Sequence, residues 1–258
     1  MKASRNQLIP SLWKRTALVL FLIFTGLTSC RRAGPDPLAR GWQRIGVEPL
    51  AGSIFLQQGE ESDCIWQVNQ AAQKVTVSRV STAVYDRADN ERIQTAGGVL
   101  VGEDHGEWGG SLSLLETNGG PPRLILDKNV VQMLQMKSGI LVVTGDLPAN
   151  EGSIWLYSIT NGREWSIEKR AELSGYPRVI GRSNSGILLV NADGVFLVDD
   201  SLKVQKLAEL PLFDVRPTSV AEDADGTIYI GMKAFVVRLV PNRTGYTHEW
   251  FAGAGCLP

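Results

Sequence analysis

SGILVV at Ser138–Val143 is nearly repeated by SGILLV at Ser185–Val190. DGTIYI at Asp225–Ile230 has the same pattern of a polar residue, a glycine and an apolar run. Two fainter copies precede them, GGVLVG at Gly97–Gly102 and GSIFL at Gly52–Leu56. A glycine that follows a polar turn and opens a run of β-branched or aromatic residues is typical of a strand after a tight hairpin. The chain is therefore expected to repeat a β-rich unit.

The spacing of these copies indicates the size of the unit. Their glycines lie 46, 41, 47 and 40 residues apart, in the order Gly52, Gly98, Gly139, Gly186 and Gly226. An offset of 40 also places Pro177 on Pro217. Each interval has room for two further strands, and one more strand precedes each glycine, which gives four strands per unit. Repeats of about 40 to 50 residues with four strands are the signature of propeller blades.

The chain from Trp42 to Phe251 divides into five such units of about 42 residues. We therefore predict an all-β fold, a β-propeller of five four-stranded blades, with no helix longer than two turns after residue 40. The units run in complete order, so no strand is expected to be exchanged between the first blade and the last. The alternative is a β-sandwich with a small extra domain, which does not explain a near-copy at a fixed offset.

One blade has an outside resemblance. PTSVAEDADGTIYIG at Pro217–Gly231 resembles the repeat of the two-component regulator propellers, bacterial sensor blades with an acidic turn, a glycine and an aromatic strand that ends in glycine. Tyr229 stands where that repeat usually has tryptophan, and Met232 replaces its usual threonine. The resemblance implies a propeller fold and a sensing or ligand-binding role, and it carries no catalytic residues across.

The amino terminus has the pattern of a secretory leader. Residues 1–15 carry four basic residues and no acidic one, and the 12-residue apolar run Thr16–Leu27 follows. LTSC at Leu27–Cys30 resembles the lipobox of bacterial lipoproteins. That resemblance implies cleavage after Ser29, a diacylglycerol thioether on Cys30 and acylation of the new amino terminus, and several acyl chains anchor a protein stably. The alternative is an ordinary cleaved signal peptide with an incidental thiol at Cys30.

These segments define the expected organisation: a signal peptide at 1–29, a lipidated cysteine and tether at 30–41, and the propeller domain at 42–258. The apolar run is too short to span a bilayer. Gly34, Pro35 and Pro37 predict that residues 31–40 do not pack. Lipoproteins held at an inner membrane commonly carry Asp after the cysteine, and here Arg31 follows it. A membrane-anchored, extracytoplasmic protein is expected, at the outer membrane where the cell has two.

Charge argues against a nucleic-acid partner. Loss of residues 1–29 removes four of the 26 basic side chains and none of the 27 acidic ones, so the formal net charge falls from −1 to −5. Proteins that bind nucleic acid present a basic surface to the phosphates. No such surface is expected here.

Two thiols remain once Cys30 carries lipid: Cys64 in the first unit and Cys256 just after the last strand. Ring closure would bring these two ends of the domain together, and envelope compartments permit disulfides. We therefore predict a Cys64–Cys256 bridge that joins the first blade to the last. The alternatives are two unpaired buried thiols, or a mobile tail that carries Cys256.

Residues with catalytic or metal-binding chemistry are few. Asp223 and Asp225 resemble the middle of a calcium loop, but Ala221 and Met232 occupy its first and twelfth ligand positions, which favours an acidic hairpin turn. EDHGE at Glu103–Glu107 could bind a divalent ion through Glu103, Asp104, His105 and Glu107, although a solvated turn is the favoured interpretation. His248-Glu249 is expected at the surface. We predict no metal, no cofactor and no catalytic residues; paired carboxylates for glycoside hydrolysis stay open.

Tryptophan is the remaining candidate for binding. Six tryptophans follow the leader and could line a groove for carbohydrate or peptide, although packing between blades is their expected role: Trp42, Trp66, Trp108, Trp155, Trp165 and Trp250.

The function expected from these features is that of a non-enzymatic binding or scaffolding lipoprotein, which presents propeller loops to an envelope protein or carbohydrate. Two alternatives stay open. One is an extracytoplasmic enzyme, a hydrolase or lyase acting on a sugar or lactone. The other is a small-ligand sensor, for which a deep apolar pocket lined by tryptophan would be the mark.

Overall fold

The computed structural model describes residues 36–38, 41–45, 64–81, 90–160, 164–210 and 216–256. The chain divides into two compact units, Met1–Arg32 and Ala33–Pro258, and all described residues belong to the second. The predicted signal peptide, the lipobox with Cys30, and the first repeat glycine, Gly52, lie outside the described residues. No described helix is long and apolar enough to cross a membrane.

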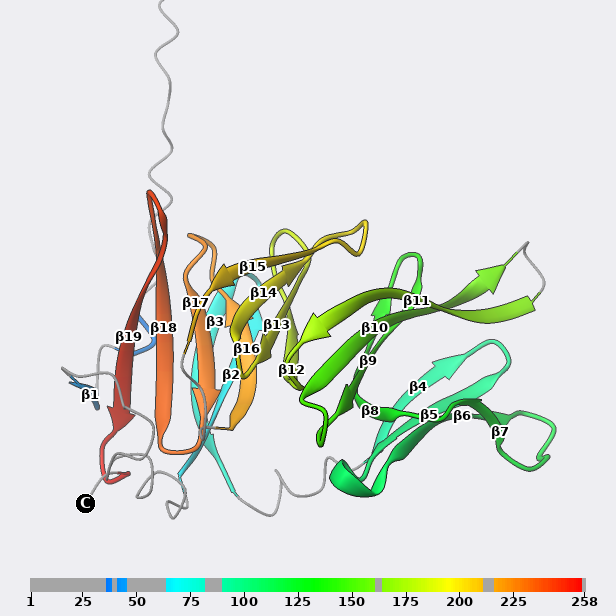
Figure 1. The fold of residues 1–258 in the computed structure, drawn as a ribbon. Coiled ribbons are helices and arrows are strands. Elements are labelled where there is room, and N and C mark those ends of the chain that lie inside the picture. The colour runs from blue at the N-terminus through cyan, green and yellow to red at the C-terminus, as the bar shows by residue number, and fades with distance from the viewer. Residues whose placement is uncertain are drawn as a thin grey trace, which may run out of the picture. The chain divides into compact units, whose positions relative to one another are not determined.

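Residues 90–208 form three four-stranded antiparallel meanders (Figure 1). The first contains β4 (Asn90–Thr95), β5 (Gly98–Asp104), β6 (Gly110–Glu116) and β7 (Arg123–Leu126). The second contains β8 (Asn129–Met136), β9 (Gly139–Asp146), β10 (Glu151–Thr160) and β11 (Glu164–Ser174). The third contains β12 (Pro177–Arg182), β13 (Ile187–Asn191), β14 (Gly194–Val198) and β15 (Val204–Ala208).

The two ends of the domain provide the other sheets. β16 (Pro217–Glu222), β17 (Ile228–Met232), β18 (Phe235–Asn242) and β19 (Gly245–Gly253) form a fourth meander, to which β1 (Trp42–Ile45) is added. β2 (Ile65–Ala71) and β3 (Lys74–Val80) form a hairpin. One three-residue 3₁₀ turn, η1 (Gly106–Trp108), is the single helical segment among the described residues. The predicted all-β class is confirmed.

Three of the repeat glycines, Gly98, Gly139 and Gly186, occupy one structural position, whereas Gly226 lies in the turn before β17 with no backbone atom close to its Cβ position. Gly139 begins β9 and Gly186 immediately precedes β13, with φ of +146° and +153°, a conformation that side-chain-bearing residues rarely adopt. A Cβ would lie 2.5 Å from the Tyr157 carbonyl oxygen at Gly139 and 2.3 Å from the Val198 carbonyl oxygen at Gly186. Glycine recurs there because the third strand's backbone crosses too close for any side chain.

The second strands are buried on both faces. Along β9, Leu141 and Val143 pack toward the β12–β15 sheet, while Ile140 and Val142 pack toward the β4–β7 sheet. Side chains of a strand alternate between its faces, so a strand that is apolar at every position must lie between two other layers. The sheets therefore stack face to face.

Four apolar clusters join the described sheets in order. They join β4–β7 to β8–β11, β8–β11 to β12–β15, β12–β15 to β16–β19, and β16–β19 to the β2–β3 hairpin. The first unit thus packs on the last. No sheet among the described strands closes on itself, and none of the four clusters joins β2–β3 to β4–β7. The structure establishes a propeller-like stack of four-stranded sheets.

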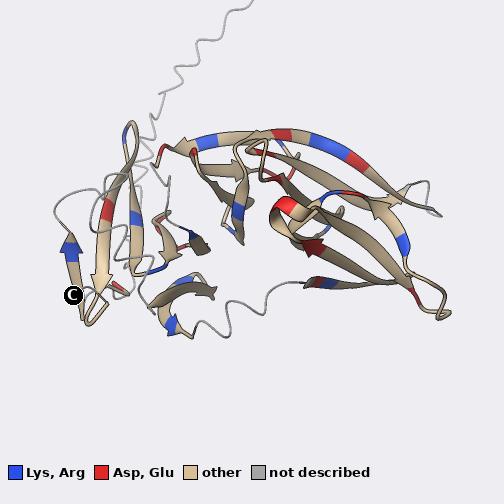
Figure 2. Ribbon diagram, turned by 60° about the horizontal axis from the view of Figure 1, so that its bottom comes forward, with Lys and Arg blue, Asp and Glu red and all other residues tan. Residues whose placement is uncertain are grey.

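Outer strands carry the charge. Along β11, glutamates lie on both sides of the basic pair Lys169-Arg170 and form the ion pairs Lys169–Glu172 and Arg170–Glu168 (Figure 2). Interspersed charge of this kind is what a strand with one solvated edge presents.

The amino-terminal end departs from the sequence expectation. β1 pairs antiparallel with β19, with Trp42 opposite Gly253 and Ile45 opposite Trp250. The prediction that the units run in complete order from Trp42, with no strand exchanged, is therefore wrong. The physical reason is the free edge of β19, whose unpaired backbone groups accept a further strand.

The tether prediction also needs correction. Leu38 is only 4% exposed and belongs to the cluster formed by β2, β3 and the last sheet. The Gly and Pro content of residues 31–40 indicated a segment that does not pack, but one apolar side chain inside it is enough to dock the chain onto the domain.

The predicted cysteine pair is confirmed at disulfide distance. Cys64 and Cys256 form a disulfide with Cα atoms 5.7 Å apart and a sequence separation of 192 residues. Cys64 precedes β2, and its carbonyl accepts a hydrogen bond of 2.7 Å from the Ala234 amide at the start of β18. The pair joins the first hairpin to the end of the last strand.

Replacing both cysteines, in a Cys64→Ser/Cys256→Ser protein, should lower the free energy of unfolding. A cross-link that closes a loop of this length restricts the unfolded chain by up to about 5 kcal/mol in the chain-entropy model. Urea unfolding with and without reductant measures the loss. The single variant Cys256→Ser should lose as much as the double variant. Two freely alkylatable thiols in protein taken from an oxidising compartment would contradict the bridge.

Candidate functional site

The loop between β5 and β6 carries the most exposed large apolar side chain of the described residues. We call Asp104–Gly110 the Trp108 loop. η1 forms because the His105 carbonyl accepts a bond of 3.2 Å from the Trp108 amide, and the His105 amide donates to Gly109 O at 2.9 Å. Gly106, the first residue of η1, and Gly109, which follows it, have φ of +61° and +87°, values that glycine adopts readily. Trp108 is left 90% exposed.

The Trp108 loop is held by two neighbouring sheets. Asn129, the first residue of β8, is buried; its Nδ2 donates to Gly106 O at 2.6 Å and its Oδ1 accepts from the His105 amide at 3.3 Å. Within the loop, Asp104 Oδ1 accepts from the Gly106 amide at 2.9 Å. The other Asp104 oxygen accepts from the hydroxyl of Tyr176, which lies between β11 and β12. The loop is therefore fixed before any partner arrives.

Tyr176 is suited to this role. Burial and the hydrogen bond to Asp104 raise the pKa of Tyr176 well above its usual value. Its hydroxyl therefore stays protonated and remains a donor throughout the physiological pH range.

A polar cleft of about 200 Å³ opens beside the loop. Its lining includes Gly106, Glu107, Asp127, Lys128, Asn129 and Asp146. The side chains of Glu107, Asp127 and Lys128 make no hydrogen bond or ion pair within the part of the chain that the structure describes. The cleft is smaller than the roughly 300–1,000 Å³ of drug-sized ligand sites, so it has room for one ring or one side chain.

The other tryptophans pack inside the domain. Trp42 lies against Trp66 with ring centroids 4.3 Å apart, Trp165 stacks on Tyr157 at 4.7 Å, and Trp250 meets Phe235 edge-on at 6.2 Å. Trp155 donates its indole N–H to Thr144 Oγ1 at 3.0 Å. The packing role predicted for tryptophan is confirmed for these five and is wrong for Trp108.

Glu103 and Asp104, two of the candidate metal ligands in Glu103–Glu107, make hydrogen bonds within the protein instead. Glu103 accepts a hydrogen bond of 3.0 Å from Ser111 Oγ, and Asp104 accepts from the Gly106 amide and the Tyr176 hydroxyl. His105 is exposed. In the described ranges, no three His, Cys, Asp or Glu side chains gather as a ligand set for a metal.

The predicted acidic hairpin turn at Asp223–Gly226 is confirmed. The Asp223 carboxylate accepts from the Asp225 amide at 3.1 Å, and the Asp225 carboxylate accepts from the Thr227 amide at 2.9 Å. The two carboxylates cap the turn between β16 and β17.

The surface position expected for Glu249 is wrong, because its side chain is only 15% exposed and bridges two arginines.

Comparisons with known proteins assign no family to the chain. No protein-family model matches the chain, and no curated protein matches it. One solved structure that it resembles, described as a functionally unknown protein from Desulfotomaculum acetoxidans DSM 771, is 17% identical with a TM-score of 0.39. The similarity covers 76% of this chain and 68% of that one. The resemblance of Pro217–Gly231 to the two-component regulator propellers stays an expectation.

Replacing Asn129 by alanine should loosen the Trp108 loop. The change leaves a carbonyl and an amide without their partner, at a cost of about 1–3 kcal/mol in the free energy of unfolding. Hydrogen exchange should accelerate across 104–110. Asn118→Ala is the matched control, because Asn118 is exposed in the β6–β7 turn of the same sheet. Equal exchange in both variants would show that Asn129 does not hold the loop.

Proposed function

We propose that this chain is a membrane-anchored lipoprotein of the cell envelope that binds a partner through the Trp108 loop. Two features support the location. The lipobox-like Leu27–Cys30 would provide the anchor, and the Cys64–Cys256 pair at disulfide distance suits an oxidising, extracytoplasmic compartment. We place it at the outer membrane where the cell has two, because Arg31 follows the cysteine.

The propeller-like stack is, in this proposal, most of a five-bladed ring. Three complete meanders, a fourth that accepts β1, and the β2–β3 hairpin follow one another in packing order. The hairpin already packs on the last meander, as the first blade of a ring must. A contact between the first unit and β4–β7 would complete the closure.

The observation that carries the binding function is a tryptophan that is both fixed and exposed. Exposed Trp on a rigid loop offers a large contact area at small cost in conformational entropy, and such residues dominate many interfaces. The adjacent cleft adds the polar side chains of Glu107, Asp127 and Lys128. An apolar ring beside hydrogen-bonding groups suits a sugar, which has an apolar face and hydroxyls. We therefore favour an envelope carbohydrate over a protein partner.

A hydrolase acting on that carbohydrate is the second candidate. Glu107, Asp127 and Asp146 are the acidic residues that line the cleft. Glycoside hydrolysis uses two carboxyl groups on either side of the scissile bond. For the sensor alternative, a deep apolar pocket would be required, and the cleft beside the loop is polar.

Replacing Cys30 by alanine should release the protein from the membrane. Metabolic labelling with a palmitate analogue should mark the wild type and not the Cys30→Ala variant, because acylation needs that thiol. The Cys64→Ser/Cys256→Ser protein is the control and should keep its label. Equal labelling of the wild type and the Cys30→Ala variant would contradict the lipoprotein proposal.

Replacing Trp108 by alanine should weaken binding without affecting stability. A hot-spot aromatic contributes about 2 kcal/mol, or roughly a 30-fold increase in Kd, and an exposed side chain contributes little to the fold. An array of envelope polysaccharides and peptidoglycan fragments identifies the ligand, and titration gives Kd.

Leu124→Ala is the matched control for that measurement. Leu124 is 59% exposed on β7 of the same sheet, so its loss should leave binding unchanged. Asp127→Asn and Asp146→Asn test the hydrolase candidate: loss of turnover with retained binding would favour an enzyme. Unchanged affinity in Trp108→Ala would reject the Trp108 loop as the binding site.

A further inference from the structure

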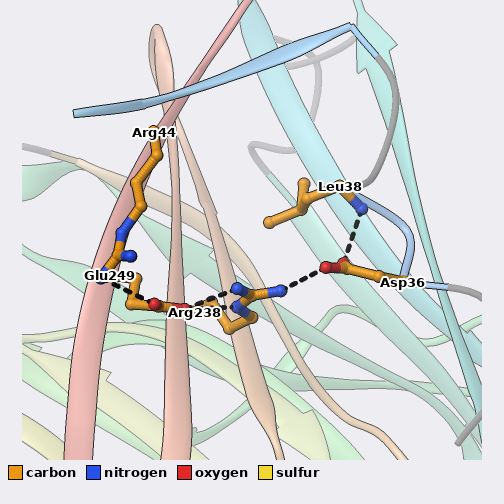
Figure 3. Close-up of polar contacts among 5 residues, drawn as sticks. All are labelled: Asp36, Leu38, Arg44, Arg238 and Glu249. Carbon is orange, nitrogen blue, oxygen red and sulfur yellow. Dashed lines mark hydrogen bonds and ion pairs between the residues drawn. The ribbon is translucent and has the colours of Figure 1, made fainter.

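Four charged side chains alternate in sign where the amino-terminal segment meets the last sheet (Figure 3). Arg238 on β18 pairs with Asp36 (Nη1 to Oδ2, 2.5 Å), and its Nε and Nη2 reach Oε2 of Glu249 on β19 at 2.8 and 2.6 Å. The other oxygen of Glu249 pairs with Arg44 of β1 at 2.8 Å. The two outer members, Asp36 and Arg44, belong to the amino-terminal segment. We call these four residues the Asp36 clamp.

The inner members of the clamp are largely removed from water. The side chains of Arg238 and Glu249 are 19% and 15% exposed. The Arg238 guanidinium also lies over the Phe251 ring, 4.8 Å from its centroid. An exposed ion pair contributes little to stability. Removing one member of a largely buried pair is costly, because the remaining charge loses its partner.

An apolar contact strengthens the attachment. The Leu38 amide donates to the second oxygen of Asp36 at 2.9 Å, which turns the chain so that the Leu38 side chain is buried. Leu38 packs in the same cluster as Tyr229 and Phe251. Asp36 and Leu38 therefore hold the chain to the last sheet several residues before β1 begins.

This attachment shortens the connection to the proposed anchor. Asp36 lies six residues after Cys30 in the sequence, whereas Trp42 lies twelve residues after it. A fully extended chain covers at most about 3.5 Å per residue, so the reach is about 20 Å in the first case and about 40 Å in the second. Asp36 and Leu38 together thus halve the maximum distance between the lipid and the first fixed residue.

We propose that the Asp36 clamp holds the domain against the bilayer surface, with the last sheet and its amino-terminal segment toward the lipid. The inference rests on the proposed lipidation of Cys30. A free twelve-residue tether would let the domain move away from the membrane and turn. The clamped six-residue connection keeps Asp36, where it pairs with Arg238 of the β16–β19 sheet, within about 20 Å of the acylated residue.

Energy transfer to the membrane tests this inference. The full mature lipidated protein is reconstituted into phosphatidylethanolamine/phosphatidylglycerol vesicles that contain an acceptor-labelled lipid. A donor amino acid at Thr244, in the exposed β18–β19 turn, reports the separation. Insertion of six Gly/Ser residues between Arg32 and Ala33 of the wild type gives the transfer expected for a twelve-residue connection.

Arg238→Gln should lower the transfer to a level between the wild type and that insertion, because Asp36 is released and the first fixed residue becomes Leu38, eight residues after Cys30. Asp36→Asn, which removes the charge and keeps the side-chain shape, should lower it in the same direction. Arg243→Gln is the matched control, since Arg243 lies exposed on the same hairpin and takes no part in the clamp. Circular dichroism checks that each variant is folded, and if Arg238→Gln is not, Asp36→Asn decides.

The outcomes separate the two proposals. If the wild type floats with the vesicles and both clamp variants give wild-type transfer, the clamp inference is overturned and the lipoprotein proposal stands. If the wild type neither floats nor carries acyl mass, the lipoprotein proposal fails, and the inference fails with it. If the wild type floats with the vesicles, and transfer falls in Arg238→Gln and Asp36→Asn but not in Arg243→Gln, both the lipoprotein proposal and the clamp inference are supported.

Discussion

Burial of the second strands on both faces is the constraint on which the rest of the domain depends. β9, β13 and β17 have nearly every side chain buried, so each needs an apolar layer on either side. A stack built this way cannot simply stop, because its last sheet would expose an apolar face to water. The β2–β3 hairpin covers that face at one end, with Val68 and Val75 packed against Tyr229 and Val236.

The chain runs directly from each meander to the next, but it does not run from the last sheet back to the first unit. Three other interactions hold the amino-terminal part of the domain to the last sheet. Cys64–Cys256 links it covalently, β1 pairs with β19, and Asp36 pairs with Arg238 across 202 residues. Of these three links, only the disulfide persists in the unfolded chain and restricts it, and the restriction is large because the loop that it closes is long. The strand pairing and the ion pair stabilise this attachment in the folded state alone.

The sequence predicted the features that local pattern controls. The glycines Gly98, Gly139 and Gly186 predicted where second strands begin, because a positive φ and a crossing backbone exclude other residues there. It did not predict that β1 joins the last sheet, because a four-residue strand with no repeat copy carries no signal for a partner about 200 residues away. The exposure of Trp108 was missed for a similar reason: it depends on Asn129 and Tyr176, which hold the loop from other sheets. The glycine-flanked sequence HGEWGG marked the loop, but not its rigidity.

Rigidity at both ends of the domain favours the same kind of partner. A fixed Trp108 loop reduces the entropy lost on binding, so even a small contact beside a cleft of about 200 Å³ can contribute affinity. On the proposed anchor, a short connection confines the domain to a layer next to the bilayer, which raises the effective concentration of any ligand fixed in that layer. Neither effect helps capture of a dilute ligand far from the membrane. The two together favour an immobile polymer of the envelope, presented repeatedly to the same loop, over a free small molecule.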